Sequence, residues 1–256
     1  MTRCAIMQPT YLPWMGYFAL IGSVDVFIFL DDVEFSRQSW QQRNRIKTQG
    51  GAQWLTVPVL LAGKSHQLIR DVRTDETKHW RRQHWNTIAQ SYAKAPHFAE
   101  HKEWLESVYQ GGEERLCDLN MQVIAALAER LGLATRFERS STLAKSDERS
   151  ARLVDCCRAV GADEYLSPPG SFDYLEADKA FENSGLALRY LHYEHPQHRQ
   201  LHGDFIPFLS ALDVLLNEGP ASGEIVQSGV RPPYTPEELR AVRRAAAAGG
   251  NAGGQP

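Results

Sequence analysis

Two adjacent carboxylates end the most apolar run near the start of the chain. Residues 24–30 (VDVFIFL) are mostly β-branched or aromatic, and Asp31, Asp32 and Glu34 follow them. Grouped carboxylates can supply a general base or oxygen ligands for a divalent cation. The alternative is a solvated strand end in which one carboxylate caps a turn. We expect Asp31 and Asp32 to be catalytic, with Glu34 beside them.

A basic, amide-rich stretch follows the carboxylates. Its centre is Arg43, Asn44 and Arg45, with Arg37 and Lys47 on either side. Guanidinium groups form paired hydrogen bonds with carboxylates and phosphates, and amides add directional ones. The stretch predicts a loop that binds anionic substrate groups through Arg43, Asn44 and Arg45. A surface loop that neutralises the preceding carboxylates is the alternative.

Four histidines fall within eleven residues late in the chain, namely His192, His195, His198 and His202. Their spacing would suit a metal on a helix, but Pro196 interrupts any helix there. We therefore expect no metal site and predict His195 as a general base or acid, or as a substrate-binding group. Placement of all four on the surface is the alternative.

The four cysteines form no C-x-x-C pair and have no metal-ligand spacing. They fit a reducing cytoplasm in which the thiols are buried. Cys156 and Cys157 lie in a predicted helix, where a cysteine usually packs as a small apolar side chain. A nucleophilic role for Cys157 is the alternative.

The elements that must hold these residues alternate between strands and helices. Continuous apolar strands such as 3–7 and 24–30 are typical of parallel sheets buried on both faces. In open sheets of this kind, ligands bind at the carboxyl ends of the strands, where Asp31 lies. Further strands are predicted at 54–60, 135–140, 164–167 and 187–193, and helices at 16–22, 75–92, 99–109, 116–131, 146–160, 174–184 and 205–216. The fold class is α/β, with a Rossmann-like, mostly parallel sheet flanked by helices and a helical subdomain.

One domain over residues 1–230 accounts for this pattern, with its helical portion at about 75–132. Beyond it the chain is rich in proline at 231–236 and in alanine and glycine at 245–256. We expect a disordered tail over 231–256, with room for a short helix at 237–248.

Composition restricts the partners. The formal net charge of -3 gives no overall attraction to nucleic acid or an anionic membrane, and no apolar run approaches the roughly 18 residues that span a bilayer. The first residues also lack the apolar stretch of a signal peptide, so we expect a cytoplasmic protein that does not bind membranes. The basic and aromatic segment 78–85 is better explained by core packing with a cationic outer face than by base stacking. No glycine-rich phosphate loop occurs, and the cofactor is unknown.

Several separate stretches resemble the WbqC-like family of bacterial polysaccharide and natural-product gene clusters. They are AIMQPTYLPWMGYF at 5–18, the strand into Asp31, WQQRNRI at 40–46, His84 with Trp85, YLS at 165–167, and 195–213. The resemblance spans roughly residues 3–229 and implies a cytoplasmic enzyme that transfers an acyl or aminoacyl group, such as glycyl, to an amine. It adds His84, Ser167 and Gln200 as candidate site residues, and places Gln8 and Tyr11 at the pocket.

The resulting prediction is amide formation on an amino-bearing small molecule or sugar nucleotide. The donor would be an acyl carrier or an aminoacyl species, and nucleic acid enters only as that donor. A weaker likeness to HIGH-type nucleotide-binding enzymes suggests an ATP-dependent ligase or nucleotidyltransferase, although Trp14 and Tyr17 stand where those enzymes have histidines. A non-catalytic binding module of a biosynthetic complex is the third hypothesis.

Overall fold

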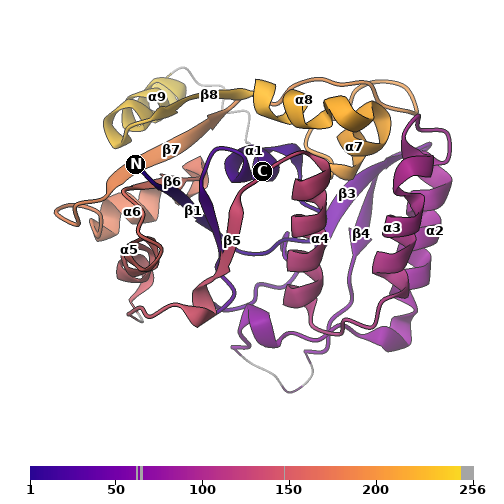
Figure 1. Ribbon diagram of the computed structural model, residues 1–256, viewed down its shortest axis with the longest axis horizontal. Coiled ribbons are helices and arrows are strands. Elements are labelled where there is room, and N and C mark those ends of the chain that lie inside the picture. Colours follow the sequence, from indigo (N-terminus) through magenta and orange to yellow (C-terminus); the bar gives the residue numbers. More distant parts are fainter. Residues whose placement is uncertain (62, 64–65, 147, 249–256) are drawn as a thin grey trace.

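A six-stranded sheet in the order β5-β2-β1-β6-β7-β8 forms the centre of the protein (Figure 1). The computed structural model describes residues 1–61, 63, 66–146 and 148–248. All neighbouring strands of this sheet run parallel except β8, which is antiparallel to β7. The strands are β1 (Arg3–Met7), β2 (Val26–Phe29), β5 (Arg136–Arg139), β6 (Glu164–Ser167), β7 (Ala187–Tyr193) and β8 (Val230–Tyr234). The predicted Rossmann-like α/β fold is confirmed.

Alternate residues of the central strands pack into two different cores. Ala5 and Phe27 contribute to one core, whereas Ile6 and Ile28 contribute to the other. This is the two-residue period of a strand that is covered on both faces. The first core includes α1 (Met15–Ile21), α4 (Leu116–Arg130), α7 (Leu212–Glu218) and α8 (Ser222–Ser228), and the second includes α5 (Arg149–Ala159), α6 (Phe172–Asp178) and α9 (Pro236–Ala248).

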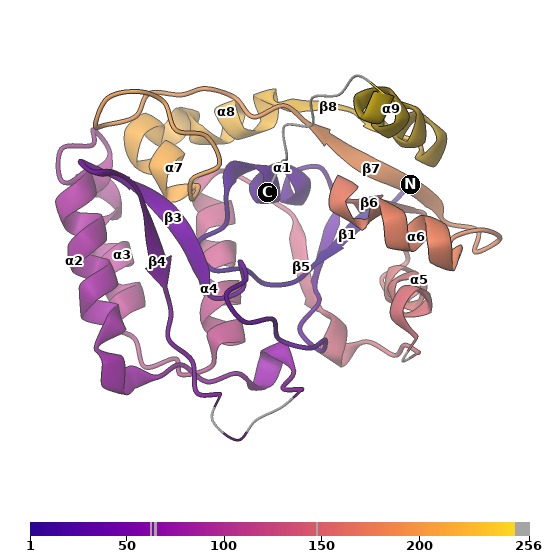
Figure 2. The same ribbon diagram turned by 180° about the vertical axis from the view of Figure 1, so that it is seen from behind.

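A hairpin and two further helices lie beyond one end of the sheet, on the far side from α5 and α6 (Figures 1 and 2). They are β3 (Arg43–Thr48), β4 (Gly51–Thr56), α2 (Trp80–Tyr92) and α3 (Phe98–Gln110). The hairpin is attached to the segment after β1, because Asn44 donates a hydrogen bond to the Leu12 carbonyl over 2.8 Å. Short 3-10 helices connect the larger elements at η1 (Ile69–Asp71), η2 (Glu76–Lys78), η3 (Ser140–Thr142), η4 (Pro169–Ser171) and η5 (Gly219–Ala221).

Several predicted elements differ from the structure. The helix expected at 174–184 ends at Asp178, and the one expected at 75–92 begins at Trp80. The expected loop around Arg43 is a strand, because its alternate residues Asn44 and Ile46 are buried on one side of the hairpin. Its partner strand covers 51–56 instead of 54–60. The expected helix at 205–216 begins only at Leu212, and residues 205–211 have irregular backbone. In the described part of the chain, no helix is long and apolar enough to cross a membrane.

The chain beyond residue 230 is ordered as far as 248, contrary to the expected disorder. Its proline-rich part forms β8, which pairs with β7 at the edge of the sheet, where a missing backbone N–H is tolerated. The expected helix is confirmed as α9, and its Leu239 is 4% exposed in the second core. Residues 249–256 of the expected tail lie outside the described residues.

Replacement of Leu239 by alanine tests whether α9 is part of the folded core. We expect the free energy of unfolding to fall by about 2 kcal/mol or more, because a buried leucine is removed. Val242 on the same helix is 46% exposed, so Val242→Ala is the matched control and should change stability by less than about 0.5 kcal/mol. Equal denaturation midpoints for the two variants would show that α9 does not stabilise the sheet.

Candidate functional site

The carboxyl ends of four parallel strands bring several predicted site residues to one edge of the sheet. The strand order reverses between β1 and β6, and α/β proteins bind ligands at the carboxyl edge beside such a reversal. Gln8 directly follows β1 and Ser167 ends β6, so both flank this point. Asp31 follows β2, and His195 follows β7.

Asp31 and His195 nevertheless belong to separate clusters. Their strands are separated by β1 and β6, which places three interstrand spacings, about 14 Å, between the strands. No hydrogen bond, ion pair or ring contact joins the two clusters in the described residues.

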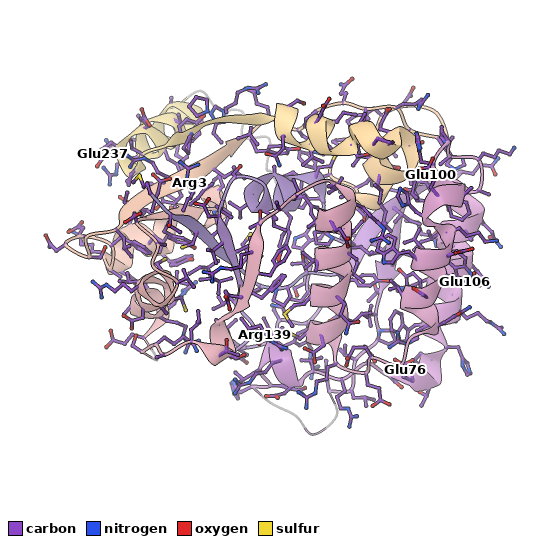
Figure 3. The ribbon with its side chains drawn as sticks, in the orientation of Figure 1. Arg3, Glu76, Glu100, Glu106, Arg139 and Glu237 are labelled. Carbon is purple, nitrogen blue, oxygen red and sulfur yellow. The ribbon has the colours of Figure 1, made fainter. Side chains whose placement is uncertain are left out.

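Asp31 is fully buried, and both of its carboxylate oxygens accept hydrogen bonds. Arg139 donates from Nε over 3.0 Å, and Ser141 donates from its backbone N–H over 2.9 Å and its hydroxyl over 2.7 Å. Ser140 adds a hydroxyl contact of 3.1 Å. Arg139 lies at the end of β5, next to η3 (Figure 3). These contacts join the ends of β2 and β5, and they favour a structural role for this carboxylate.

Asp32 is bound by a second set of cations. Lys145 Nζ lies 2.7 Å from its carboxylate, Arg152 lies 4.0 Å away, and the Ser140 hydroxyl donates to it. Burial raises the pKa of Asp32, but the hydrogen bonds from Lys145 and Ser140 outweigh it, and the net effect is a lowered pKa. Glu34 points elsewhere and contacts His66 over 3.0 Å. Within the described ranges no three His, Cys, Asp or Glu side chains are grouped to hold a metal ion, so the cation alternative for these carboxylates is not supported.

The hairpin carries the predicted anion-binding residues. Arg43 and Arg45 lie 4.5 and 5.6 Å from the Trp54 ring. Asn44 points to the opposite side and is 1% exposed, so its amide supports the backbone at Leu12. Gln8 accepts a 2.7 Å hydrogen bond from Gln41, which fixes the first residue after β1.

Tyr11 and His84 meet inside the protein. The Tyr11 hydroxyl lies 2.9 Å from His84 Nδ1 and 2.8 Å from the Tyr109 hydroxyl. Burial lowers the pKa of the His84 imidazole to about 4, so the ring is neutral at physiological pH. The contact joins the segment after β1 to α2 and α3.

His195 packs in an aromatic cluster with Trp14, Tyr193 and Phe208. The ring centroid of Phe208 lies 4.8 Å from that of His195, and that of Trp14 lies 5.8 Å away. The Phe208 backbone N–H donates to His195 Nε2 over 3.3 Å. Burial, and next the nearby His198, lower the pKa of His195 to about 4. A neutral imidazole whose Nε2 accepts a hydrogen bond carries its proton on Nδ1.

Two polar atoms of this cluster are buried without a hydrogen-bond partner. They are His195 Nδ1 and the hydroxyl oxygen of Tyr193. Burial raises the pKa of Tyr193, so its phenol stays protonated and can donate. Both rings contact Trp14, Tyr193 at a centroid distance of 5.8 Å. The cluster therefore contains two unused hydrogen-bond donors. Tyr193 has no signal in the sequence beyond its place at a predicted strand end.

A buried network holds the segment that carries His195. His198 Nε2 lies 2.7 Å from Asp213, whose other oxygen accepts from the Tyr92 hydroxyl over 2.8 Å. The side chains of His198 and Asp213 are only 3% and 1% exposed. Lys47 adds hydrogen bonds to Gln200 and to the carbonyls of Gly203 and Asp204. Gln200, a predicted site residue, thus holds this segment against β3.

Ser167 and Cys157 make only internal contacts. The Ser167 hydroxyl is fully buried and bonds with Tyr165 and Ser171. Cys157 Sγ lies 3.3 Å from Cys4 Sγ, and this contact together with burial raises its thiol pKa. A protonated, inaccessible thiol is a poor nucleophile.

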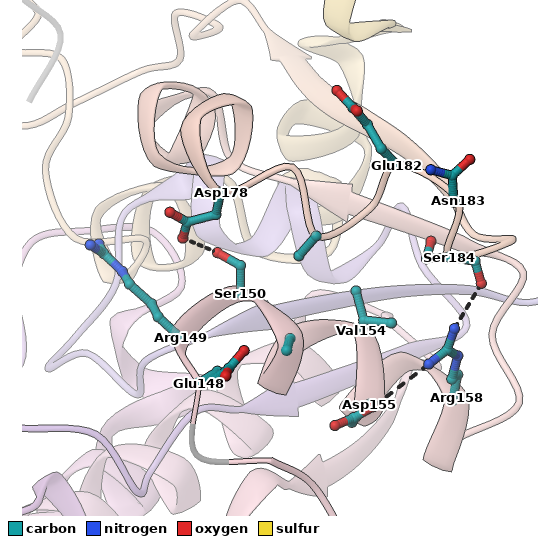
Figure 4. Close-up of a pocket in the computed structure, with 12 residues that line it drawn as sticks. Glu148, Arg149, Ser150, Val154, Asp155, Arg158, Asp178, Glu182, Asn183 and Ser184 are labelled. Atoms are coloured by element: carbon teal, nitrogen blue, oxygen red, sulfur yellow. Dashed lines mark hydrogen bonds and ion pairs between the residues drawn. The ribbon is translucent and has the colours of Figure 1, made fainter.

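Three cavities lie away from the carboxyl edge. The cavity of about 670 Å³ is formed by α5, α6 and the segment after α6, with Ser150 bonded to Asp178 at its wall (Figure 4). Cavities of about 490 and 460 Å³ lie next to α3, one toward α4 and one toward α2. Neither Asp31 nor His195 lines any of the three.

Comparison with known proteins gives two matches. The family model described as "WbqC-like protein family" matches residues 8–225. "Uncharacterized protein Rv1507c" of Mycobacterium tuberculosis is 38% identical over 221 residues, which cover 86% of this chain and 95% of the relative. No solved structure matches the chain.

Replacement of Asp31 by asparagine tests its structural role. Loss of the charge weakens the hydrogen bonds that Asp31 accepts from Arg139 and Ser141, whereas Arg139 keeps its ion pair with Asp118. We expect the free energy of unfolding to fall by about 2 kcal/mol. Glu34→Gln, at an exposed carboxylate in the same segment, is the control and should change stability by less than about 0.5 kcal/mol. An Asp31→Asn variant of unchanged stability would restore the catalytic interpretation of this residue.

Stability should depend on pH through His84. Its folded pKa of about 4 lies below the ordinary 6.5, so its stabilising effect is complete above pH 6.5 and is lost as the pH falls from 6.5 to 4. The difference between these two pKa values corresponds to a loss of about 3 kcal/mol in the free energy of unfolding. Chemical denaturation from pH 7.5 to 4 should show a flatter pH dependence for His84→Gln, and an unchanged one for a control at the exposed His66. An equally steep slope in His84→Gln would contradict the assignment.

Proposed function

The chain belongs to the WbqC-like protein family, and on that premise we propose that it transfers an acyl or aminoacyl group, such as glycyl, to an amine. The acceptor would be an amino-bearing small molecule or sugar nucleotide of polysaccharide or natural-product biosynthesis. The observation that supports this proposal best is the pair of buried, unpartnered donors at Tyr193 and His195.

Acyl transfer needs donors of this kind. When an amine attacks the carbonyl carbon of a thioester or ester, the carbonyl oxygen becomes an oxyanion, and fixed donors in a dry site stabilise it. Unpaired buried donors are costly, by about 1–3 kcal/mol each, and need an explanation. The proposed explanation is that His195 Nδ1–H and the Tyr193 hydroxyl bind this oxygen.

A neutral imidazole suits the role better than a charged one. With a pKa of about 4, His195 keeps one proton at physiological pH and donates it in a hydrogen bond without transferring it. The intermediate then collapses to the amide and expels the thiolate or alkoxide. The proton lost by the amine passes to that leaving group, so the charges balance without a carboxylate base. Asp31 and Asp32 stay predictions as bases, but their oxygens are engaged in hydrogen bonds and ion pairs.

His198 and Asp213 act as positioning residues in this proposal. Their hydrogen bond of 2.7 Å, together with Lys47, holds the segment on which His195 lies.

The Tyr17 hydroxyl donates to the Gln8 carbonyl over 3.0 Å, and Trp14 packs on His195. Neither residue offers an acidic proton to a phosphate, so no contact here favours the adenylate-forming alternative.

Mass spectrometry of reaction mixtures tests the proposal. Purified protein is incubated with amino-sugar nucleotides and with acyl thioesters or aminoacyl-tRNA, and we expect an amide product. Tyr193→Phe removes one donor and keeps the ring, and it should lower kcat about 100-fold. His195→Phe should have a similar effect.

Two controls lie on the same sheet. His192 and Tyr234 stack on each other and are hydrogen-bonded over 3.0 Å, so His192→Phe and Tyr234→Phe should keep full activity. Full activity in Tyr193→Phe and His195→Phe would contradict the proposed oxyanion site. Release of AMP or pyrophosphate in the presence of ATP would instead identify a ligase.

A further inference from the structure

The outer face of the hairpin carries an unusual aromatic pair. Trp54 is 43% exposed and is the only exposed aromatic side chain among the large hydrophobic residues of the described part of the chain. Trp40 lies beside it at a centroid distance of 5.5 Å, with the two rings tilted by 39°. The tilt leaves the two indoles incompletely stacked. The Arg43 guanidinium lies 4.5 Å from the centre of the Trp54 ring, and the exposed 43% of Trp54 is the part that another planar group can contact.

Two arginines next to this pair have no acidic partner. Arg45 is directly opposite Trp54 in the hairpin, and Arg43 lies one alternate position along the same strand. Most arginines in the described part of the chain have a carboxylate within 4.0 Å, as Arg139 and Arg231 do, whereas neither of these has one. Arg45 Nε is moreover buried without any hydrogen-bond partner. Among the described residues no carboxylate neutralises these two guanidinium groups, so both can bind an anion beside the Trp54 ring.

We infer that Trp40, Trp54, Arg43 and Arg45 bind the nucleoside diphosphate part of a nucleotide-linked substrate. Indole rings stack on the flat face of any base, and guanidinium groups form paired hydrogen bonds with phosphate oxygens. The two kinds of side chain lie side by side, as base and phosphate do in a nucleotide. The protein as a whole carries a net charge of -3, so attraction of an anion depends on this local group.

The extent of the cationic surface favours a small nucleotide over a polynucleotide. Lys47 is the next residue on this side of β3, and its ammonium group is already bound by Gln200 and two carbonyl oxygens. Along β3, the open positive charge therefore ends at Arg45. A polynucleotide needs a longer series of phosphate contacts than two arginines provide.

The site is connected to the proposed oxyanion donors. Ser210 donates its backbone N–H to the Arg45 carbonyl over 2.9 Å and forms a bridge with Trp14, which packs on His195. A nucleotide held at Arg43 and Arg45 would present an attached amino sugar toward His195. This last step rests on the proposed transferase function, whereas nucleotide binding itself does not.

Isothermal titration calorimetry tests the inference without any acyl donor. The probes are UDP, dTDP, uridine, thymidine and inorganic pyrophosphate. We expect at least one nucleoside diphosphate to bind with a Kd below about 1 mM, the upper end of usual Michaelis constants. Trp54→Leu removes the stacking surface and should weaken that binding by roughly 5- to 150-fold. Because the Trp54 ring also packs against Arg43, pyrophosphate binding should weaken as well, but by a smaller factor than nucleotide binding. Arg43→Gln should weaken pyrophosphate and nucleotide alike, by about tenfold or more.

A matched cation–aromatic pair elsewhere provides the control. Arg130 lies 4.0 Å from the Trp104 ring, so Trp104→Leu and Arg130→Gln remove the same chemistry from another surface and should not change nucleotide binding. Thermal unfolding verifies that each variant is folded. The inference is overturned if the wild type binds none of the nucleoside diphosphates, if Trp54→Leu binds them as the wild type does, or if a short single-stranded RNA binds more tightly than they do. Nucleotide binding without amide formation would refute the proposed function and leave this inference intact.

Discussion

The desolvation of the His195 imidazole is the constraint on which the proposed chemistry depends. Trp14, Tyr193 and Phe208 surround the ring, and the Phe208 backbone N–H occupies one of its two nitrogens. Low polarity disfavours the charged form, and the occupied Nε2 places the remaining proton on Nδ1. A weakly basic histidine, which would be a poor choice as a general base, thereby becomes a fixed donor.

The protein uses its charges in two different ways. At the ends of β2 and β5, the carboxylates of Asp31 and Asp32 form ion pairs with three cations, namely Arg139, Lys145 and Arg152. These pairs hold the segments that follow the two strands together. On the hairpin, by contrast, the arginines have aromatic neighbours and no acid. Guanidinium groups that no carboxylate already neutralises can pair with an anion from solution, so the hairpin is the better place to look for a bound anion.

The sequence was sufficient to predict the sheet and the edge of the sheet at which the candidate site residues lie. The apolar runs that form β1 and β2 are typical of strands buried on both faces, and parallel strands bring Gln8, Asp31 and His195 to a common edge. The sequence did not predict the distances between residues along that edge. The order of the strands sets these distances, and it depends on contacts between residues far apart in the sequence. The separation of Asp31 from His195 is a distance of this kind.

Two other differences have local causes. The stretch with Arg43 and Arg45 is polar enough to suggest a loop, but alternate burial of Asn44 and Ile46 against the helices makes it a strand. The proline-rich segment after residue 230 suggested disorder, yet an edge strand accepts prolines where a central one does not. In both segments the secondary structure depends on the element that the segment packs against or pairs with, and composition alone does not determine it. The cytoplasmic location and the identity of the donor stay predictions.

Nitrogen-15 chemical shifts of the histidine rings, followed from pH 8 to pH 4, show which ring nitrogen of His195 is protonated and when the ring becomes charged. We expect His195 to carry its single proton on Nδ1 and to stay neutral until the pH approaches about 4. A proton on Nε2, or a ring that becomes charged near pH 6.5, would contradict this expectation.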